Sequence, residues 1–150
     1  MTNVVIDSGS GTVKSGLAGD DTPSCIIKTI TGEFVKPGDS TIFVGEEVIS
    51  NKDTCLAVKY PIEHGIVTCW DGLEVIWRHS FEELGVDSKE SNVMLTGNFC
   101  PTKVNKERPV EIMFEKFDTP AVYIADQFQL ALYSAGRTTG VVVEVSSLMI

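Results

Sequence analysis

The order of the apolar segments is the feature that most constrains the fold of this chain. Short β-branched runs suited to strands come first, over Asn3–Asp7, Ser24–Ile30 and Thr41–Gly45. From Asp71 onward, helical periodicity alternates with further strand-like runs. This order predicts an α/β fold in which helices pack on a mixed sheet, with parallel strand pairs in its second half.

Three helices are expected in the second half of the chain. The first has Asp71 as its N-cap and Glu74 three residues on, as in a capping box, and it ends before Gly85 with an apolar stripe of Leu73, Trp77, Phe81 and Leu84. The second carries Val110, Met113, Phe114 and Phe117 on one face, with Pro109 in its first turn. The third helix is expected to run from an N-cap at Asp126 to Gly136. Strands are expected between and after these helices, at Asn92–Thr96, Ala121–Ala125 and Gly140–Val145.

Length and charge narrow the class of protein. A chain of 150 residues is long enough for one domain, and 21 Asp+Glu against 12 Lys+Arg give a net charge of -9 that repels polyanions, which argues against nucleic-acid binding. The four cysteines are widely spaced with no C-x-x-C pair, as in reduced, mostly buried thiols. With no signal peptide or membrane-spanning apolar run, a cytoplasmic location is expected.

A glycine-rich turn follows the first strand. The stretch "IDSGSGTVKSGLAGD" lacks helical periodicity after its glycines, so it predicts a hairpin in place of a strand-to-helix turn. Backbone N–H groups in such a turn can converge on a phosphate, Lys14 can reach terminal phosphates, and Asp7 can hold Mg²⁺ through its water shell. The spacing fits neither the Walker loop nor G-x-G-x-x-G, and a hairpin turn without a ligand has a similar sequence. Both interpretations stay open on the loop alone.

Further motifs supply a family resemblance. The glycine turn is followed by "GLAGDD", "KYPIEHGIVTCWDGLEVIWRHSF", "IMFEKFDTPAVYIADQ" and "LYSAGRTTG". Together, and in this order, these segments strongly resemble the N-terminal part of the actin family from Asn3 to about Val143. The resemblance implies the RNase H-like fold shared with Hsp70-type chaperones and sugar kinases, with residues 1–31 and 51–150 in a larger subdomain and 32–50 in a short insert subdomain.

The resemblance also implies a function and a set of site residues. Actin-family proteins bind ATP with a divalent ion such as Mg²⁺ between two similar halves, hydrolyse it slowly, and assemble into cytoskeletal filaments. By correspondence, Asp7 faces the metal, Gln127 orients the attacking water, and His64 matches a histidine near the nucleotide. The first phosphate loop corresponds to Ser8, Gly9, Ser10, Gly11, Thr12 and Lys14.

The sequence departs from the family where a second phosphate loop is expected. In place of D-S-G-D-G it reads Glu144, Val145, Ser146, Ser147 and Leu148, so its glycines are lost while Glu144 keeps the acidic charge for cofactor binding. The residues up to Ile150 also lack the half that supplies the other wall of the cleft. We therefore expect weak or lost ATP and Mg²⁺ binding, and catalysis is disfavoured.

Several functions remain open at this stage. One is an actin-like cytoskeletal protein that keeps the first phosphate loop. Another is a non-catalytic module, or a truncated fragment without ATPase activity, that binds actin, actin-binding proteins or folding chaperones. A third is a product of altered splicing with no role of its own, as the change of sequence after Gly140 suggests. No nucleic-acid or membrane partner is expected.

Overall fold

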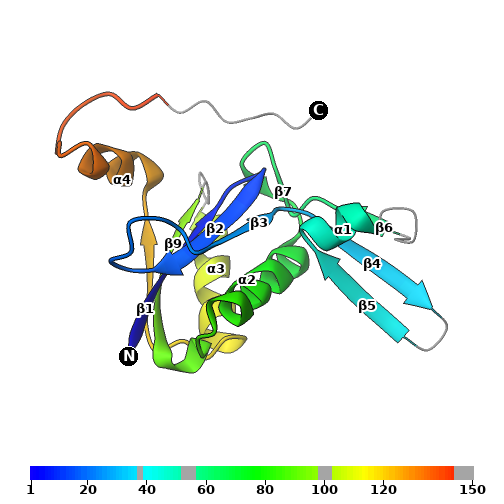
Figure 1. Ribbon diagram of the computed structural model, residues 1–150. Coiled ribbons are helices and arrows are strands. Elements are labelled where there is room, and N and C mark those ends of the chain that lie inside the picture. The colour runs from blue at the N-terminus through cyan, green and yellow to red at the C-terminus, as the bar shows by residue number, and fades with distance from the viewer. Residues whose placement is uncertain (37–38, 52–56, 98–102, 144–150) are drawn as a thin grey trace.

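A five-stranded mixed sheet forms the centre of the molecule (Figure 1). The computed structural model describes residues 1–36, 39–51, 57–97 and 103–143. In spatial order the strands are β10-β9-β1-β2-β3, where β1, β2 and β3 form an antiparallel meander and β9 runs parallel to both β1 and β10. Their bounds are β1 Thr2–Ser8, β2 Thr12–Leu17, β3 Cys25–Lys28, β9 Ser91–Gly97 and β10 Val122–Ala125. The mixed sheet with its parallel second half, and the hairpin after the first strand, are confirmed.

Helices α2 (Trp70–Leu84) and α3 (Lys103–Glu115) cover one face of this sheet. Ile6 of β1 lies opposite Leu95 of β9, and both side chains are fully buried against the helices. The rings of Phe81 and Phe117 lie with their centroids 5.4 Å apart, which joins α2 to the segment directly after α3. The core is made of Val4, Ile6, Val13, Cys25, Ile27, Val44, Ile62, Leu73, Ile76, Trp77, Phe81, Val93, Leu95, Ile112, Met113 and Phe117.

The first two predicted helices exist, but their starts differ from prediction. Helix α2 begins at Trp70 and its N-cap is Cys69, whose Sγ accepts the N–H of Gly72, so the expected cap at Asp71 is wrong. Asp71 lies in the first turn, where its negative charge favours the helix dipole. Helix α3 begins at Lys103, which puts Pro109 inside the helix and not in its first turn.

The buried faces of these helices follow the predicted stripes only in part. Gly85 ends α2 in the left-handed conformation, with φ of 65°, as a C-terminal glycine is expected to do. On α3, Phe114 is 45% exposed, whereas the neighbouring Ile112 is buried with Met113. Met113 and Phe117 of the predicted stripe are therefore buried as expected, whereas Phe114 is not and Ile112 is buried in addition.

A small second sheet extends from the central one, with strand order β5-β4-β6. It contains β4 (Thr31–Lys36), β5 (Asp39–Val44) and β6 (Ala57–Lys59), and α1 (Glu46–Ser50) follows β5. β4 pairs antiparallel with β5 on one side and with β6 on the other. A two-stranded ribbon, β7 (Ile62–Glu63) with β8 (Ile66–Val67), lies between β6 and α2. Since β6 belongs to the small sheet, that sheet reaches beyond residues 32–50, and the subdomain division stays a prediction.

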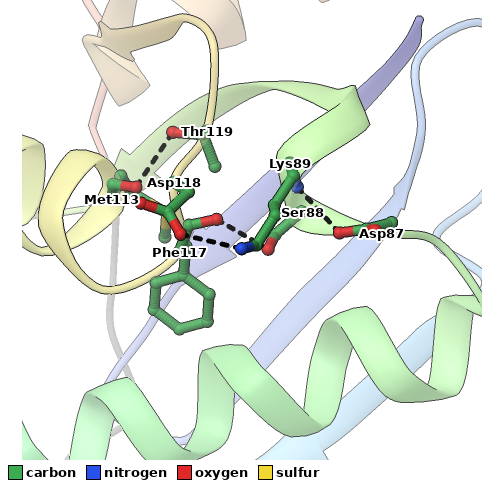
Figure 2. A network of polar contacts seen from close by, with 7 residues as sticks. All are labelled: Asp87, Ser88, Lys89, Met113, Phe117, Asp118 and Thr119. Carbon is green, nitrogen blue, oxygen red and sulfur yellow. Dashed lines mark hydrogen bonds and ion pairs between the residues drawn. The ribbon is translucent and has the colours of Figure 1, made fainter.

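Two loops at the entry to β9 and β10 are joined by polar contacts (Figure 2). The short helix η1 (Ser88–Glu90) begins at Asp87, whose side chain accepts the N–H of Lys89. Ser88 Oγ donates to the carbonyl of Phe117 at 2.7 Å, and Lys89 Nζ lies 3.1 Å from a carboxylate oxygen of Asp118. These contacts fix the end of α3 against the start of β9, and so set where β10 enters the sheet.

The last described helix, α4 (Gln127–Ser134), follows β10 directly. Asp126 caps it as predicted, accepting the N–H groups of Phe128 and Gln129 at 2.8 and 3.3 Å. After α4 the chain runs on without rejoining the sheet (Figure 1), and residues 140–143 form no strand, contrary to prediction. No described strand pairs with this segment, and the remainder of the expected strand lies outside the described residues. No helix of the described chain has the length and apolar character needed to span a membrane.

Candidate functional site

Two hydrogen bonds from Thr29 fix the turn between β1 and β2. Thr29 is fully buried; its Oγ1 donates to the carbonyl of Gly9 at 2.7 Å, and its N–H donates to the carbonyl of Gly11 at 3.1 Å. In a trans peptide the C=O and the following N–H point in opposite directions. Because Thr29 binds the Gly9 carbonyl, the N–H of Ser10 is directed away from Thr29, toward the outside of the turn.

Two backbone donors of the turn are open. Within the described residues, no hydrogen bond engages the N–H of Ser10 or Gly11, whereas the N–H of Gly9 donates to Thr12 at 3.1 Å. A Cβ atom on Gly11 would meet no atom within 4 Å, so the space in front of this residue is open. The turn can therefore contact an anion through the N–H groups of Ser10 and Gly11.

Ser8 faces the core and not the turn. It is 2% exposed, and its Oγ accepts the indole N–H of Trp77 at 3.1 Å. Its hydroxyl therefore faces Trp77 in the core. Only the backbone of Ser8 remains for the predicted phosphate binding. Lys14 lies opposite Asp7 in the β1–β2 register and is exposed. Its ammonium group therefore has room to approach a ligand bound at the glycine turn.

Asp7 and Gln127 are brought together although 120 positions separate them. Gln127 is the first residue of α4, and its Nε2 donates to Asp7 Oδ1 at 3.1 Å. Asp7 lies near the carboxyl end of β1, and the Asp126 cap fixes the first turn of α4 that carries Gln127. A glutamine in a first helical turn is ordinarily solvated, but here it contacts the acidic side chain that precedes the glycine turn.

These residues are compatible with a hydrated Mg²⁺ ion, though not with a protein cage for a metal. Among the described residues, no group of three or more His, Cys, Asp or Glu side chains could hold an ion. Mg²⁺ usually keeps several waters and uses one or two carboxylates together with phosphate oxygens. Asp7, partly exposed beside two open amide donors, fits that pattern.

Two predicted residues lie elsewhere. His64 is exposed at the turn of the β7–β8 ribbon with φ of 51°, followed by Gly65 at 76°, as in a tight hairpin with two left-handed residues. No contact described for His64 joins it to the glycine turn. Glu144, with the rest of the altered second loop, lies outside the described residues.

Thr29 is the functional candidate that the sequence did not reveal. It sits in the unremarkable run "CIIKTIT", and it acts only because β3 brings it behind the glycine turn. Trp77 was expected in the core and is fully buried there, but its hydrogen bond to Ser8 also anchors the end of β1.

Comparison with known proteins agrees with this architecture. The family model described as Actin matches residues 1–148. An actin-like protein of Neurospora crassa is 40% identical over 148 residues, which cover 94% of this chain but 39% of the relative. The chain thus spans well under half the length of that relative. With the family model matched over nearly every residue, the chain belongs to the actin family.

Proposed function

We propose that this chain is an actin-like cytoskeletal protein that binds Mg²⁺-ATP weakly. The binding site lies at the carboxyl end of β1, where Asp7 precedes the glycine turn. The Gln127–Asp7 contact carries the proposal, because it joins the two family positions assigned to the metal and to the attacking water. The Thr29 contacts, which turn the Ser10 amide outward, supply the adjoining phosphate position.

Each residue has a distinct role in this proposal. The N–H groups of Ser10 and Gly11 donate to phosphate oxygens, and the exposed Lys14 adds a positive charge. Asp7 accepts hydrogen bonds from waters around Mg²⁺, which when bound neutralises charge on the phosphates. Gln127, released from Asp7, directs its carboxamide toward a water near the terminal phosphate.

The binding is proposed to be weak because the donors described here lie on one side of the phosphates. Charge-assisted hydrogen bonds contribute about 1.5–3 kcal/mol each. The sequence Glu144–Leu148 lacks the glycines of a second loop, and the loss of two such bonds lowers affinity by roughly 10²- to 10⁴-fold. Rapid hydrolysis is not expected of these residues, since the attacking water is controlled from one side.

Thermal denaturation with and without Mg²⁺-ATP tests the proposal. Ligand at about 100 times its dissociation constant adds about 2.7 kcal/mol to the free energy of unfolding. Asp7→Asn should abolish the Mg²⁺-dependent part of the shift, while Asp20→Asn, which removes an exposed carboxylate on the loop after β2, should leave it intact. Absence of any shift for the unmodified protein at millimolar ATP would contradict the proposal.

A second function is favoured by exposed apolar side chains. On α4, Phe128 is 51% and Tyr133 59% exposed, and on the face of the sheet opposite α2, Ile26 is 60% and Tyr123 63% exposed. We propose as the alternative a non-catalytic module that uses such surfaces to bind actin, actin-binding proteins or folding chaperones, and so to act in the cytoplasm at filaments.

Co-sedimentation with actin filaments tests this alternative. Saturable binding that is lost in a Phe128→Ser, Tyr133→Ser variant, and kept when the polar Gln129 is changed to Ser, would support it. Binding that is absent, together with a clear Mg²⁺-ATP shift, would favour the nucleotide-binding proposal.

A further inference from the structure

Thr96, near the end of β9, carries a buried hydroxyl with no partner. The residue is 5% exposed, and its Oγ1 has no hydrogen-bond partner among the described residues. Buried polar groups in proteins are nearly always hydrogen-bonded, and each exception calls for a physical explanation. The position of Thr96 in the sheet supplies one.

The strand register puts Thr96 on the same face as Asp7. Thr96 pairs with Asp7 on β1 and with Ala125 on β10. One residue earlier, Leu95 and Ile6 both face the helices, so the next pair points to the opposite face. The hydrogen bond between the side chains of Asn92 and Asn3, an even number of residues away, confirms that paired residues on this face meet.

Gln127 must pass over Thr96 to reach Asp7. It follows β10, which is separated from β1 by β9, and adjacent strands lie about 4.8 Å apart. Its side chain therefore crosses β9 at the level where Ala125, Thr96 and Asp7 are aligned. Thr96 is buried at this level, although Tyr123, on the same face, is 63% exposed.

We propose that Thr96 is a positioning residue for Gln127. This inference rests on the proposed function. When Asp7 turns to the water shell of the ion, Gln127 Nε2 loses its acceptor. Rotation of Thr96 about χ1 then lets Oγ1 donate to Gln127 Oε1. That bond holds the carboxamide over β9 with its N–H groups free to face a phosphate or water. In this structure Gln127 Nε2 donates to Asp7 Oδ1 instead, and the Thr96 hydroxyl has no partner among the described residues.

Thr96→Val, nearly isosteric but without a hydroxyl, separates this role from a structural one. Because the hydroxyl has no partner among the described residues, the variant should unfold at the same or a higher urea concentration than the unmodified protein. The control is Thr119→Val: the Thr119 hydroxyl is also buried but donates to the Met113 carbonyl at 3.1 Å, so this variant should be less stable. Loss of stability in Thr96→Val would overturn the inference.

Mg²⁺-ATP titration supplies the second measurement. Thr96→Val should weaken binding by about 2- to 10-fold, as loss of one neutral hydrogen bond does, and Thr96→Ser should restore it. In a Gln127→Leu background, Thr96→Val should have no further effect. Equal binding by the unmodified protein and Thr96→Val, or an undiminished effect in that background, would overturn only this inference. Absence of binding by the unmodified protein would overturn the proposed function and, with it, the inference.

Discussion

The hydroxyl of Thr29 should stabilise both the fold and the glycine turn. Thr29→Val keeps the size of the side chain but removes the donor that reaches the Gly9 carbonyl at 2.7 Å. Thr29 is fully buried and Gly9 is partly buried, and an acceptor that loses its partner in such a place costs about 1–3 kcal/mol. For a protein of this length each kcal/mol lowers Tm by about 2–4 °C, so we expect a decrease of about 2–12 °C.

Urea denaturation followed by tryptophan fluorescence measures this effect, because Trp77 is fully buried in the folded state. The midpoint should fall with no change in the slope m. Thr29→Ser, which keeps the hydroxyl, should recover most of the loss. Mg²⁺-ATP affinity should also fall in Thr29→Val, since the Gly9 carbonyl no longer fixes the direction of the Ser10 amide. An unchanged midpoint in Thr29→Val would refute the reasoning, because it would mean that the hydroxyl bond to Gly9 adds nothing.

Three further predictions concern packing, capping and a thiol. Gly72→Ala should lose about 1–3 kcal/mol of stability in urea denaturation, because its Cβ would lie 2.9 Å from Cγ of Pro61; equal stability would contradict the close packing. Asp126→Ala should lose about 0.5–2 kcal/mol through the N-cap of α4, measured in the same way, with Asp126→Asn close to the unmodified protein. Burial raises the pKa of the Cys25 thiol, helped by the charge of Glu83, so its alkylation at pH 8, followed by mass spectrometry, should be slower than in the urea-unfolded chain. Because the unfolded chain releases this proton at a lower pH than the folded chain, the stability that Cys25 contributes should fall as pH rises from the ordinary thiol pKa through the raised one; equal alkylation rates would contradict the raised pKa.

Periodicity identified the elements of the central sheet better than their ends. The Leu73–Trp77–Phe81 stripe fixed the buried face of α2, because each of these large side chains gains by leaving water. The cap was missed because cysteine is an unusual N-cap, and its thiol accepts only a weak hydrogen bond from Gly72. The start of α3 was missed because a proline inside a helix is unfavourable, so the first turn is where sequence reasoning puts it.

The candidate site was predictable only in part. Asp7 and the glycine turn follow from the chemistry of local residues, but Gln127 was named from the family resemblance. Its contact with Asp7 depends on β10 lying next to β9, which local patterns do not specify. Thr29 and Thr96 gave no signal, since a threonine in a strand-like run ordinarily only packs. The strand expected over Gly140–Val145 is absent from its described part, where no described strand lies beside residues 140–143 to pair with them.

The parallel pairing of β1 with β9 has a consequence for synthesis on the ribosome. β1 and β2 can form their hairpin early, but more than 80 residues separate the end of β1 from the start of β9. At about 5–20 residues per second, the nascent chain presents the open edge of β1 for several seconds. An unpaired strand edge can associate with other chains. A factor that shields this edge until β9 emerges should therefore raise the yield of folded protein.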